Sequence, residues 1–189
     1  MSDLLQRELL RTSNGLRGGR SYRLLSRHDA QSLQIFYQSL SGEERHLRFG
    51  GAVSDCSIAQ YCAGIDWDAT ILIARAGPYC LEAVATIVRI DPDRVENAIA
   101  CPVICNPPVI IPALLRLSVI AARATFGASR MVFVADPVAA AFSRGIGDVT
   151  IENDQAILDL SRLRLADPSE AADRFTAARL CGAGGGRRG

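Results

Sequence analysis

Runs of apolar and β-branched positions predict a series of short strands along the chain. Each run is bounded by glycine, proline or charged residues, as strands usually are. The expected strands are Tyr22–Leu25, Thr70–Arg75, Leu81–Ile90, Ala98–Cys105, Met131–Ala135 and Val149–Ile151. Gly77-Pro78 separates the second run from the third, which predicts an antiparallel hairpin.

Apolar residues at helical spacing predict helices between these strands. The expected helices are Arg27–Gln38, one that begins near Ser41–Glu44 and carries Leu47 and Phe49, Ser57–Ala63, Pro112–Phe126 and Val138–Arg144. Ser26 and Asp29 have the spacing of a capping box, and Gly127 can end the long helix. A further element is expected at Ile157–Leu165. This order predicts an α+β, or mixed α/β, domain with a central, mostly antiparallel sheet flanked by helices.

Composition narrows the class of protein. The chain has 189 residues, 49% of them hydrophobic and 22% charged, which is typical of a globular domain. All 21 basic residues are Arg, yet the formal net charge is only +1, so we expect no nucleic-acid partner. Six cysteines without a secretory signal predict reduced thiols in the cytoplasm, and two histidines without a C-x-x-C pattern predict no metal site.

One apolar stretch raises the question of a membrane. Residues Ile99–Leu115 carry no charge. Four prolines interrupt the stretch, Arg116 follows it, and it is shorter than the roughly 20 residues that a spanning helix needs. We therefore expect a buried strand and helix, and no membrane partner.

Three groups of polar residues have more than one interpretation. Arg45, His46 and Arg48 could form an anion or partner site, or they could be a solvated helix face. Asp66-Trp67-Asp68 could contact an amine substrate, or Trp67 could pack against the hairpin. The segment Ser143-Arg144-Gly145-Ile146-Gly147 could be a phosphate-binding loop, or it could be the end of a helix.

A longer motif carries a family resemblance. The run Ser39-Leu40-Ser41-Gly42-Glu43-Glu44-Arg45-His46-Leu47-Arg48-Phe49 is followed by Ile65-Asp66-Trp67-Asp68 and the strand Ile71–Ala74. This order resembles a bacterial branch of the GNAT superfamily of acyl-CoA-dependent N-acyltransferases, and the similarity continues more weakly to about Gly147. The resemblance implies a GNAT-like domain at 20–165. Before it, Leu4, Leu5, Leu9 and Leu10 predict a short amphipathic helix that breaks at Asn14-Gly15 and Gly18-Gly19, so we expect a flexible N-terminal arm at 1–19. After it, Gly184-Gly185-Gly186 indicates a C-terminal helix or disordered tail at 166–189.

In the family, the fourth strand and the following turn and helix hold acyl-CoA. The turn has the pattern Q/R-x-x-G-x-G/A, and it falls here on Asn106-Pro107-Pro108-Val109-Ile110-Ile111. The positions implied for cofactor binding are Cys101, Val103, Asn106, Val109 and Ile111. The prolines lack an N–H, the β-branched residues resist the conformations that glycine allows, and no Arg lies between 95 and 115. We therefore expect no bound cofactor, or acetyl-CoA if the chain is a transferase.

The resemblance also implies positions for acid–base catalysis. Glu96 lies near the place where family members often have a general base, although a plain surface or turn carboxylate is the favoured interpretation. The family's general acid is often a Tyr, but Ser143 is the only hydroxyl between Asp136 and Gly147. The sequence thus predicts a diverged GNAT-fold protein without acetyl transfer, acting as a binding or regulatory module with a protein partner or as a homo-oligomer. The alternative is an active acyl-CoA-dependent N-acetyltransferase with an altered cofactor loop.

Overall fold

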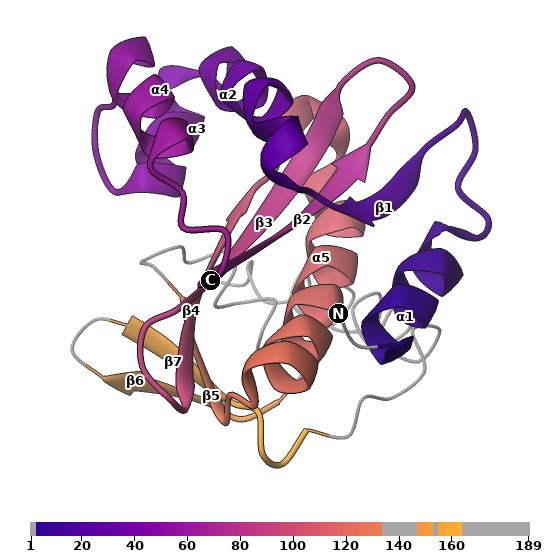
Figure 1. Ribbon diagram of the computed structural model, residues 1–189, viewed down its shortest axis with the longest axis vertical. Coiled ribbons are helices and arrows are strands. Elements are labelled where there is room, and N and C mark those ends of the chain that lie inside the picture. The colour runs from indigo at the N-terminus through magenta and orange to yellow at the C-terminus, as the bar shows by residue number, and fades with distance from the viewer. Residues whose placement is uncertain (1–2, 134–146, 153–154, 164–189) are drawn as a thin grey trace, which may run out of the picture.

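The computed structural model describes residues 3–133, 147–152 and 155–163, which form a central sheet between two layers of helices (Figure 1). The strands are β1 (Ser21–Leu24), β2 (Thr70–Ala76), β3 (Leu81–Arg89), β4 (Arg94–Ala100), β5 (Arg130–Phe133), β6 (Val149–Glu152) and β7 (Gln155–Asp159). The helices are α1 (Asp3–Ser13), α2 (Ala30–Ser39), α3 (Gly42–Phe49), α4 (Asp55–Ala63) and α5 (Pro107–Ala121). The mixed α/β class is therefore as predicted.

The sheet has the order β1-β2-β3-β4-β5-β7-β6, and β4–β5 is its one parallel pair within the described chain. A parallel pair needs a crossover, which α5 supplies between β4 and β5. The pairing of these two strands runs from Arg94 opposite Arg130 to Asn97 opposite Phe133. In the described part of the chain, Ala98–Ala100 then pairs with β3 alone, so one edge of β4 has no partner strand there.

The two faces of the sheet carry two separate hydrophobic clusters. One lies under α1 and α5 and includes Leu5, Leu114 and Phe133. The other lies under α2 and α4 and includes Leu33, Tyr37 and Ile58. Figure 1 shows α2, α3 and α4 grouped at one side of the sheet, and α5 and α1 at the other. Burial of these apolar faces is the main source of the stability of the fold.

The N-terminal segment corrects one expectation, because it packs on the domain instead of forming a loose arm. Leu5 and Leu9 are buried on one face of α1 and belong to the cluster under α5. Arg116 Nη2 on α5 donates to Glu8 Oε2 at 3.1 Å, and the Tyr22 N–H donates to Ser13 Oγ at 2.8 Å. The leucines that predicted an amphipathic helix therefore form the face by which α1 packs on the domain.

The fourth strand and the long helix both lie earlier in the sequence than predicted. β4 ends at Ala100 because Pro102 lacks the N–H that a ladder needs, and residues Val103–Cys105 form a 3₁₀ turn. α5 begins at Pro107, so Pro107 and Pro108 occupy its first positions, where a missing N–H costs little. Pro112, the expected first residue, lies inside the helix. The helix ends in a π-helical turn at Ala122–Phe126, and Gly127 closes it in the left-handed conformation, as predicted.

Residues Pro107–Phe126 make the one helix in the described chain that is long and apolar enough to cross a membrane. More than half of it is buried within the domain, against the sheet and α1. An apolar helix enclosed on both sides is what a protein core requires, and the expectation of a buried helix is met.

The last predicted elements are partly described. The strand expected at Val149–Ile151 is β6, and the element expected at Ile157–Leu165 is represented by β7. The helix expected at Val138–Arg144 and the segment 166–189 lie outside the described residues.

Candidate functional site

The connection between β4 and α5, residues 101–106, is the place where the sequence predicted a cofactor site. Within it, Asn106 has a φ of 62°, a left-handed conformation that is uncommon for a residue with a side chain. This conformation reverses the chain direction and lets Pro107 begin the helix. The six-residue turn aligned to Asn106–Ile111 therefore falls almost entirely within α5, and the strand-to-helix connection lies just before it.

Several backbone donors of this connection are already engaged. Cys105 N–H donates to the Pro102 carbonyl at 2.9 Å, and Asn106 N–H donates to the Val103 carbonyl at 3.3 Å. In the first turn of α5 the two prolines have no N–H, and Val109 N–H donates to the Asn106 carbonyl at 3.1 Å. A phosphate-binding helix start offers free N–H groups to the anion. These donors are directed to the chain itself.

The remaining described bond of the connection joins it to a distant acid. Val103 N–H donates to Glu44 Oε1 on α3 at 3.0 Å. The other carboxylate oxygen of Glu44 accepts the Ser41 N–H at 2.8 Å, as in a capping box at the start of α3. Burial raises the pKa of Glu44, but the N–H groups of Ser41 and Val103 lower that pKa by more, so the carboxyl is held below its usual range. A fixed negative charge therefore lies against the connection.

The implied cofactor positions lie in different environments. Val103 and Val109 are 78% and 61% exposed, whereas Ile111 is buried. Cys101 is half-buried and Asn106 is exposed. Ile104, which the sequence did not single out, is 92% exposed beside Val103. The result is a surface of three apolar side chains, Val103, Ile104 and Val109, which we name the connection patch.

The two cysteines of this region are weak nucleophiles. Burial raises the pKa of the Cys101 thiol to about 12, with Cys105 contributing to the same direction. Burial also raises the pKa of Cys105. Because the thiolate is the reactive form, both groups stay protonated near neutral pH. Both side chains are half-buried and pack against the hydrophobic cluster under α1 and α5.

The implied catalytic residues are less well defined. Glu96 lies on β4 and is half-buried. Because side chains alternate along a strand, it leaves the sheet on the same face as Ala100, toward α2, α3 and α4. No hydrogen bond or ion pair engages its carboxylate among the described residues. Ser143 lies outside the described residues, so the structure places only one of the two candidates.

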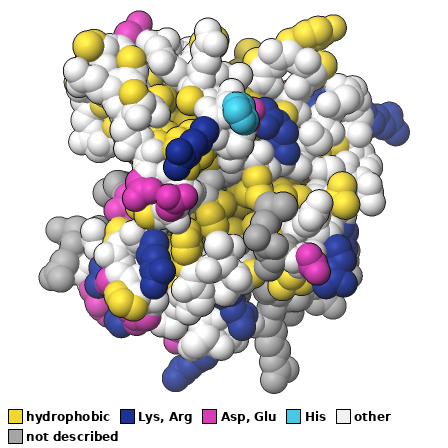
Figure 2. All heavy atoms as spheres, viewed as in Figure 1, with side chains coloured by type: hydrophobic (Ala, Val, Ile, Leu, Met, Phe, Trp, Pro, Cys, Tyr) yellow, Lys and Arg dark blue, Asp and Glu magenta, His cyan; other side chains and the backbone are white. Residues whose placement is uncertain are grey.

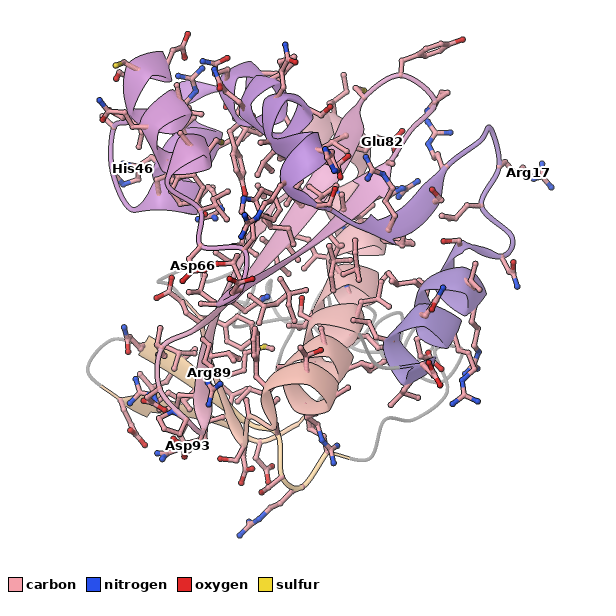
Figure 3. The ribbon with its side chains drawn as sticks, viewed as in Figure 1. Arg17, His46, Asp66, Glu82, Arg89 and Asp93 are labelled. Carbon is pink, nitrogen blue, oxygen red and sulfur yellow. The ribbon has the colours of Figure 1, made fainter. Side chains whose placement is uncertain are left out.

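The three charged residues of α3 do not form a common site. Arg45 donates to the carbonyls of Gln38, Leu40 and Val53 and to Asp55, so it fastens the ends of α2 and α4 together. His46 is exposed on the outer side of the helix layer (Figure 3). Arg48 points inward and is only 8% exposed, which corrects the interpretation of these residues as a solvated face.

Arg48 is the centre of a buried cluster between the helices and the sheet. Its Nη2 donates to Tyr61 Oη at 2.9 Å, to Thr86 Oγ1 at 3.0 Å and to Tyr37 Oη at 3.4 Å. Its guanidinium carbon lies 4.9 Å from the ring centroid of Phe49, 5.3 Å from that of Tyr37 and 5.6 Å from that of Tyr61. These distances are typical of cation–π contacts. We name Arg48, Tyr37, Tyr61 and Thr86 the arginine cluster.

The Asp66-Trp67-Asp68 segment is structural at its centre. Trp67 packs against the cluster under α2 and α4, as the packing interpretation predicted. Asp66 accepts the N–H groups of Asp68 and Ala69 and so shapes the turn into β2 (Figure 3). No group of three or more His, Cys, Asp or Glu side chains suited to a metal ion occurs within the described ranges.

Comparison with known proteins identifies the fold. No protein-family model and no curated protein sequence matches the chain. Several solved structures are similar to it. The GNAT domain of S. lividans PAT has 19% identity and a TM-score of 0.58, over 74% of this chain and 88% of that one. A phosphinothricin acetyltransferase from Sinorhizobium meliloti in complex with AcCoA has 16% identity and a TM-score of 0.53, over 74% and 86%.

A third similar structure is the spermidine N-acetyltransferase of Vibrio cholerae in complex with CoA and spermine. It has 13% identity and a TM-score of 0.53, over 74% of this chain and 92% of that one. At these identities the likeness is one of fold. The seven-stranded sheet, with its parallel β4–β5 pair and crossover helix, is the GNAT fold.

Proposed function

Because the chain has the GNAT fold, we propose that it is a diverged member of that fold which binds a partner and does not transfer acetyl groups. The observation that carries this proposal is the bond from Val103 N–H to the Glu44 carboxylate. The strand-to-helix connection of a GNAT protein serves an anion, the pyrophosphate of acyl-CoA. In this chain a carboxylate of the protein already lies against that connection.

Charge and donor count support the proposal together. A pyrophosphate brought to residues 101–109 would meet the ionised Glu44, and like charges a few ångströms apart repel. The prolines at the start of α5 remove two N–H donors, and Val109 N–H is engaged. No Arg lies between 95 and 115 to compensate the phosphate charge. The similar structures from S. meliloti and V. cholerae contain AcCoA and CoA. For this chain, comparable binding requires the connection to rearrange.

The connection patch is the surface that we propose for partner binding. Val103, Ile104 and Val109 are large apolar side chains with exposed fractions of 78%, 92% and 61%. Exposed apolar side chains that gather at one place are typical of interaction surfaces, whereas scattered ones are ordinary. Figure 2 shows one face of the molecule, on which apolar side chains gather between acidic and basic ones, whereas the connection patch is defined by the exposed fractions of its three residues. The proposed partner is a protein, either another chain or a second copy of this one.

Thermal unfolding in the presence of acetyl-CoA tests the loss of the cofactor. A ligand that binds only the folded state raises the midpoint temperature of unfolding. At a ligand concentration of 100 times the dissociation constant, the free energy of unfolding rises by about 2.7 kcal/mol. We expect no shift for the wild type at about 1 mM acetyl-CoA. Glu44→Gln is the matched variant, because it keeps an acceptor for Val103 N–H and removes the charge. A saturable shift in the wild type would support the alternative, an active N-acetyltransferase with an altered loop.

Ile104→Asp tests the partner surface. Sedimentation of the wild type over a wide concentration range shows whether a second copy is the partner, and Ile104→Asp then abolishes the dimer. If the wild type is monomeric, cross-linking followed by capture identifies a different chain. A partner that Ile104→Asp retains as well as the wild type would contradict the assignment of the connection patch. Leu10→Asp is the matched control, since Leu10 is 64% exposed on the distant α1.

A further inference from the structure

The arginine cluster contains a buried positive charge without a negative partner. Arg48 is 8% exposed, and none of its described contacts is a carboxylate. Its partners are three neutral hydroxyls and the faces of aromatic rings. Taking an ion out of water costs several kcal/mol unless an opposite charge or a full set of hydrogen bonds compensates it. A guanidinium in this environment therefore has unused capacity to bind an anion.

The hydrogen bonds of Arg48 are also incomplete. All three described bonds are donated by Nη2, and the buried Nε has no hydrogen-bond partner among the described residues. Arginine carries five N–H donors in a planar fork that matches the two oxygens of a carboxylate. The Nε donor is held in place by packing, because the guanidinium lies between the rings of Tyr37, Phe49 and Tyr61. The group is thus pre-organised and partly unsatisfied.

The cluster lies close to the surface on one side. Phe49 and Tyr61 are half-buried, and the Tyr61 hydroxyl contacts Arg48 directly. On the sheet side, Thr86 is paired with Ala98 on β4, which is half-buried at the edge where β4 has no further partner strand in the described chain. The side of the cluster between α3 and α4, where Phe49 and Tyr61 are partly exposed, is therefore the side from which a small molecule would reach Arg48.

From these observations we propose that Arg48 is the anchor of a binding site for a small carboxylate-bearing molecule, held between α3, α4 and the sheet. The carboxylate accepts from Arg48 Nε, while the hydroxyls of Tyr61 and Thr86 keep the guanidinium in position. This site is separate from the connection patch, and it does not depend on whether the chain binds acyl-CoA.

Titration with malonate and with glutarate tests the site. At constant ionic strength, with chloride as the reference anion, the thermal midpoint of the wild type rises by about 3–6 °C at roughly ten times the dissociation constant. Arg48→Met removes this dependence. The midpoint of the variant in chloride is its own reference, because the hydroxyls of Tyr37, Tyr61 and Thr86 lose their donor and the variant is less stable than the wild type. Arg27→Met, at a side chain that is 70% exposed, is the control and keeps the carboxylate response.

A second measurement does not depend on the folding of a variant. In wild-type protein labelled with ¹⁵N, the Arg48 Nε–H resonance, assigned by its absence in Arg48→Lys, shifts saturably as malonate or glutarate is added. Two results would overturn the proposal. One is an equal midpoint rise in the wild type and Arg48→Met. The other is an unchanged Nε–H resonance at about 0.1 M carboxylate, a concentration that would saturate even millimolar binding.

Discussion

Glu44 Oε1 accepts the backbone N–H of Val103 at 3.0 Å, across 59 residues of sequence. The bond joins the start of α3 to the connection between β4 and α5. It links the layer of α2, α3 and α4 to the segment that follows β4. It also places a carboxylate where a GNAT fold otherwise binds a phosphate. The same side chain caps α3, so one residue serves both the local and the long-range structure.

Replacement of Glu44 tests the structural part of this relationship. Glu44→Ala removes the acceptors of Ser41 N–H and Val103 N–H, and we expect a loss of about 1–2 kcal/mol in the free energy of unfolding. Urea unfolding at pH 7 measures it. Glu43→Ala, at an exposed neighbour in the same helical turn, should change stability by less than about 0.5 kcal/mol. Equal effects of the two variants would contradict the role of Glu44.

Asp29 predicts a specific dependence of stability on pH. The hydrogen bond from Arg23 is the main cause that lowers the pKa of Asp29 to about 2, and the Ser26 N–H adds to it. Since the folded pKa lies below the unfolded value of about 3.9, the stabilisation is present above pH 4 and is lost as the pH falls toward 2. Asp29→Asn should lack this component of the acid loss in urea unfolding measured from pH 6 to pH 2. Asp68→Asn, at a side chain that is 92% exposed, should retain it.

Ser118 and Thr86 should respond in opposite ways to loss of their hydroxyl groups. Ser118 is fully buried in α5, and its Oγ has no hydrogen-bond partner within the part of the chain that the structure describes, so Ser118→Ala should leave stability unchanged or raise it by about 1 kcal/mol. Thr86 Oγ1 accepts from Arg48 and is bonded to Tyr37 Oη, so Thr86→Val should cost about 1–3 kcal/mol. Thermal unfolding measures both. A larger loss for Ser118→Ala than for Thr86→Val would contradict the hydrogen-bond assignment.

Arg45 should be a stabilising residue. Arg45→Met leaves the carbonyls of Gln38 and Leu40 without their donor and releases Asp55, and we expect a loss of about 1–3 kcal/mol in urea unfolding. Arg27→Met is the control, because its exposed ion pair with Asp68, at 3.9 Å, contributes little. A loss for Arg45→Met as small as that of the control would show that the contacts contribute no stability.

The sequence was sufficient for much of the fold because many signals are local. The β2–β3 hairpin follows from two apolar runs around Gly77-Pro78, and Gly127 ends the long helix in the left-handed conformation that favours glycine. The boundary errors are local too. The predicted strand ran through Pro102, although proline cannot donate to a ladder, and the helix start was assigned to Pro112 when Pro107 and Pro108 already suit the first helical positions.

The candidate sites were less predictable because their contacts are long-range. From the sequence, Glu44 was identified only as part of a helix start and of the family motif. Its bond to Val103 depends on how α3 docks beside β4. Arg48 follows two exposed residues of α3, His46 and Leu47, so a solvated face was a reasonable expectation. Only the packing of α3 against Tyr37, Tyr61 and Thr86 turns this arginine inward. The aromatic residues at 37, 49 and 61 were the available signal.

Direct calorimetric titration of the full chain with acetyl-CoA tests the central claim most directly. With Glu44 against the Val103 N–H and prolines at the start of α5, we predict no saturable heat at millimolar acetyl-CoA. Glu44→Gln, titrated in parallel, reports whether the negative charge alone is the barrier. Saturable binding by the wild type in the micromolar range, about −8 kcal/mol, would contradict the account and restore the chain to the working acyltransferases.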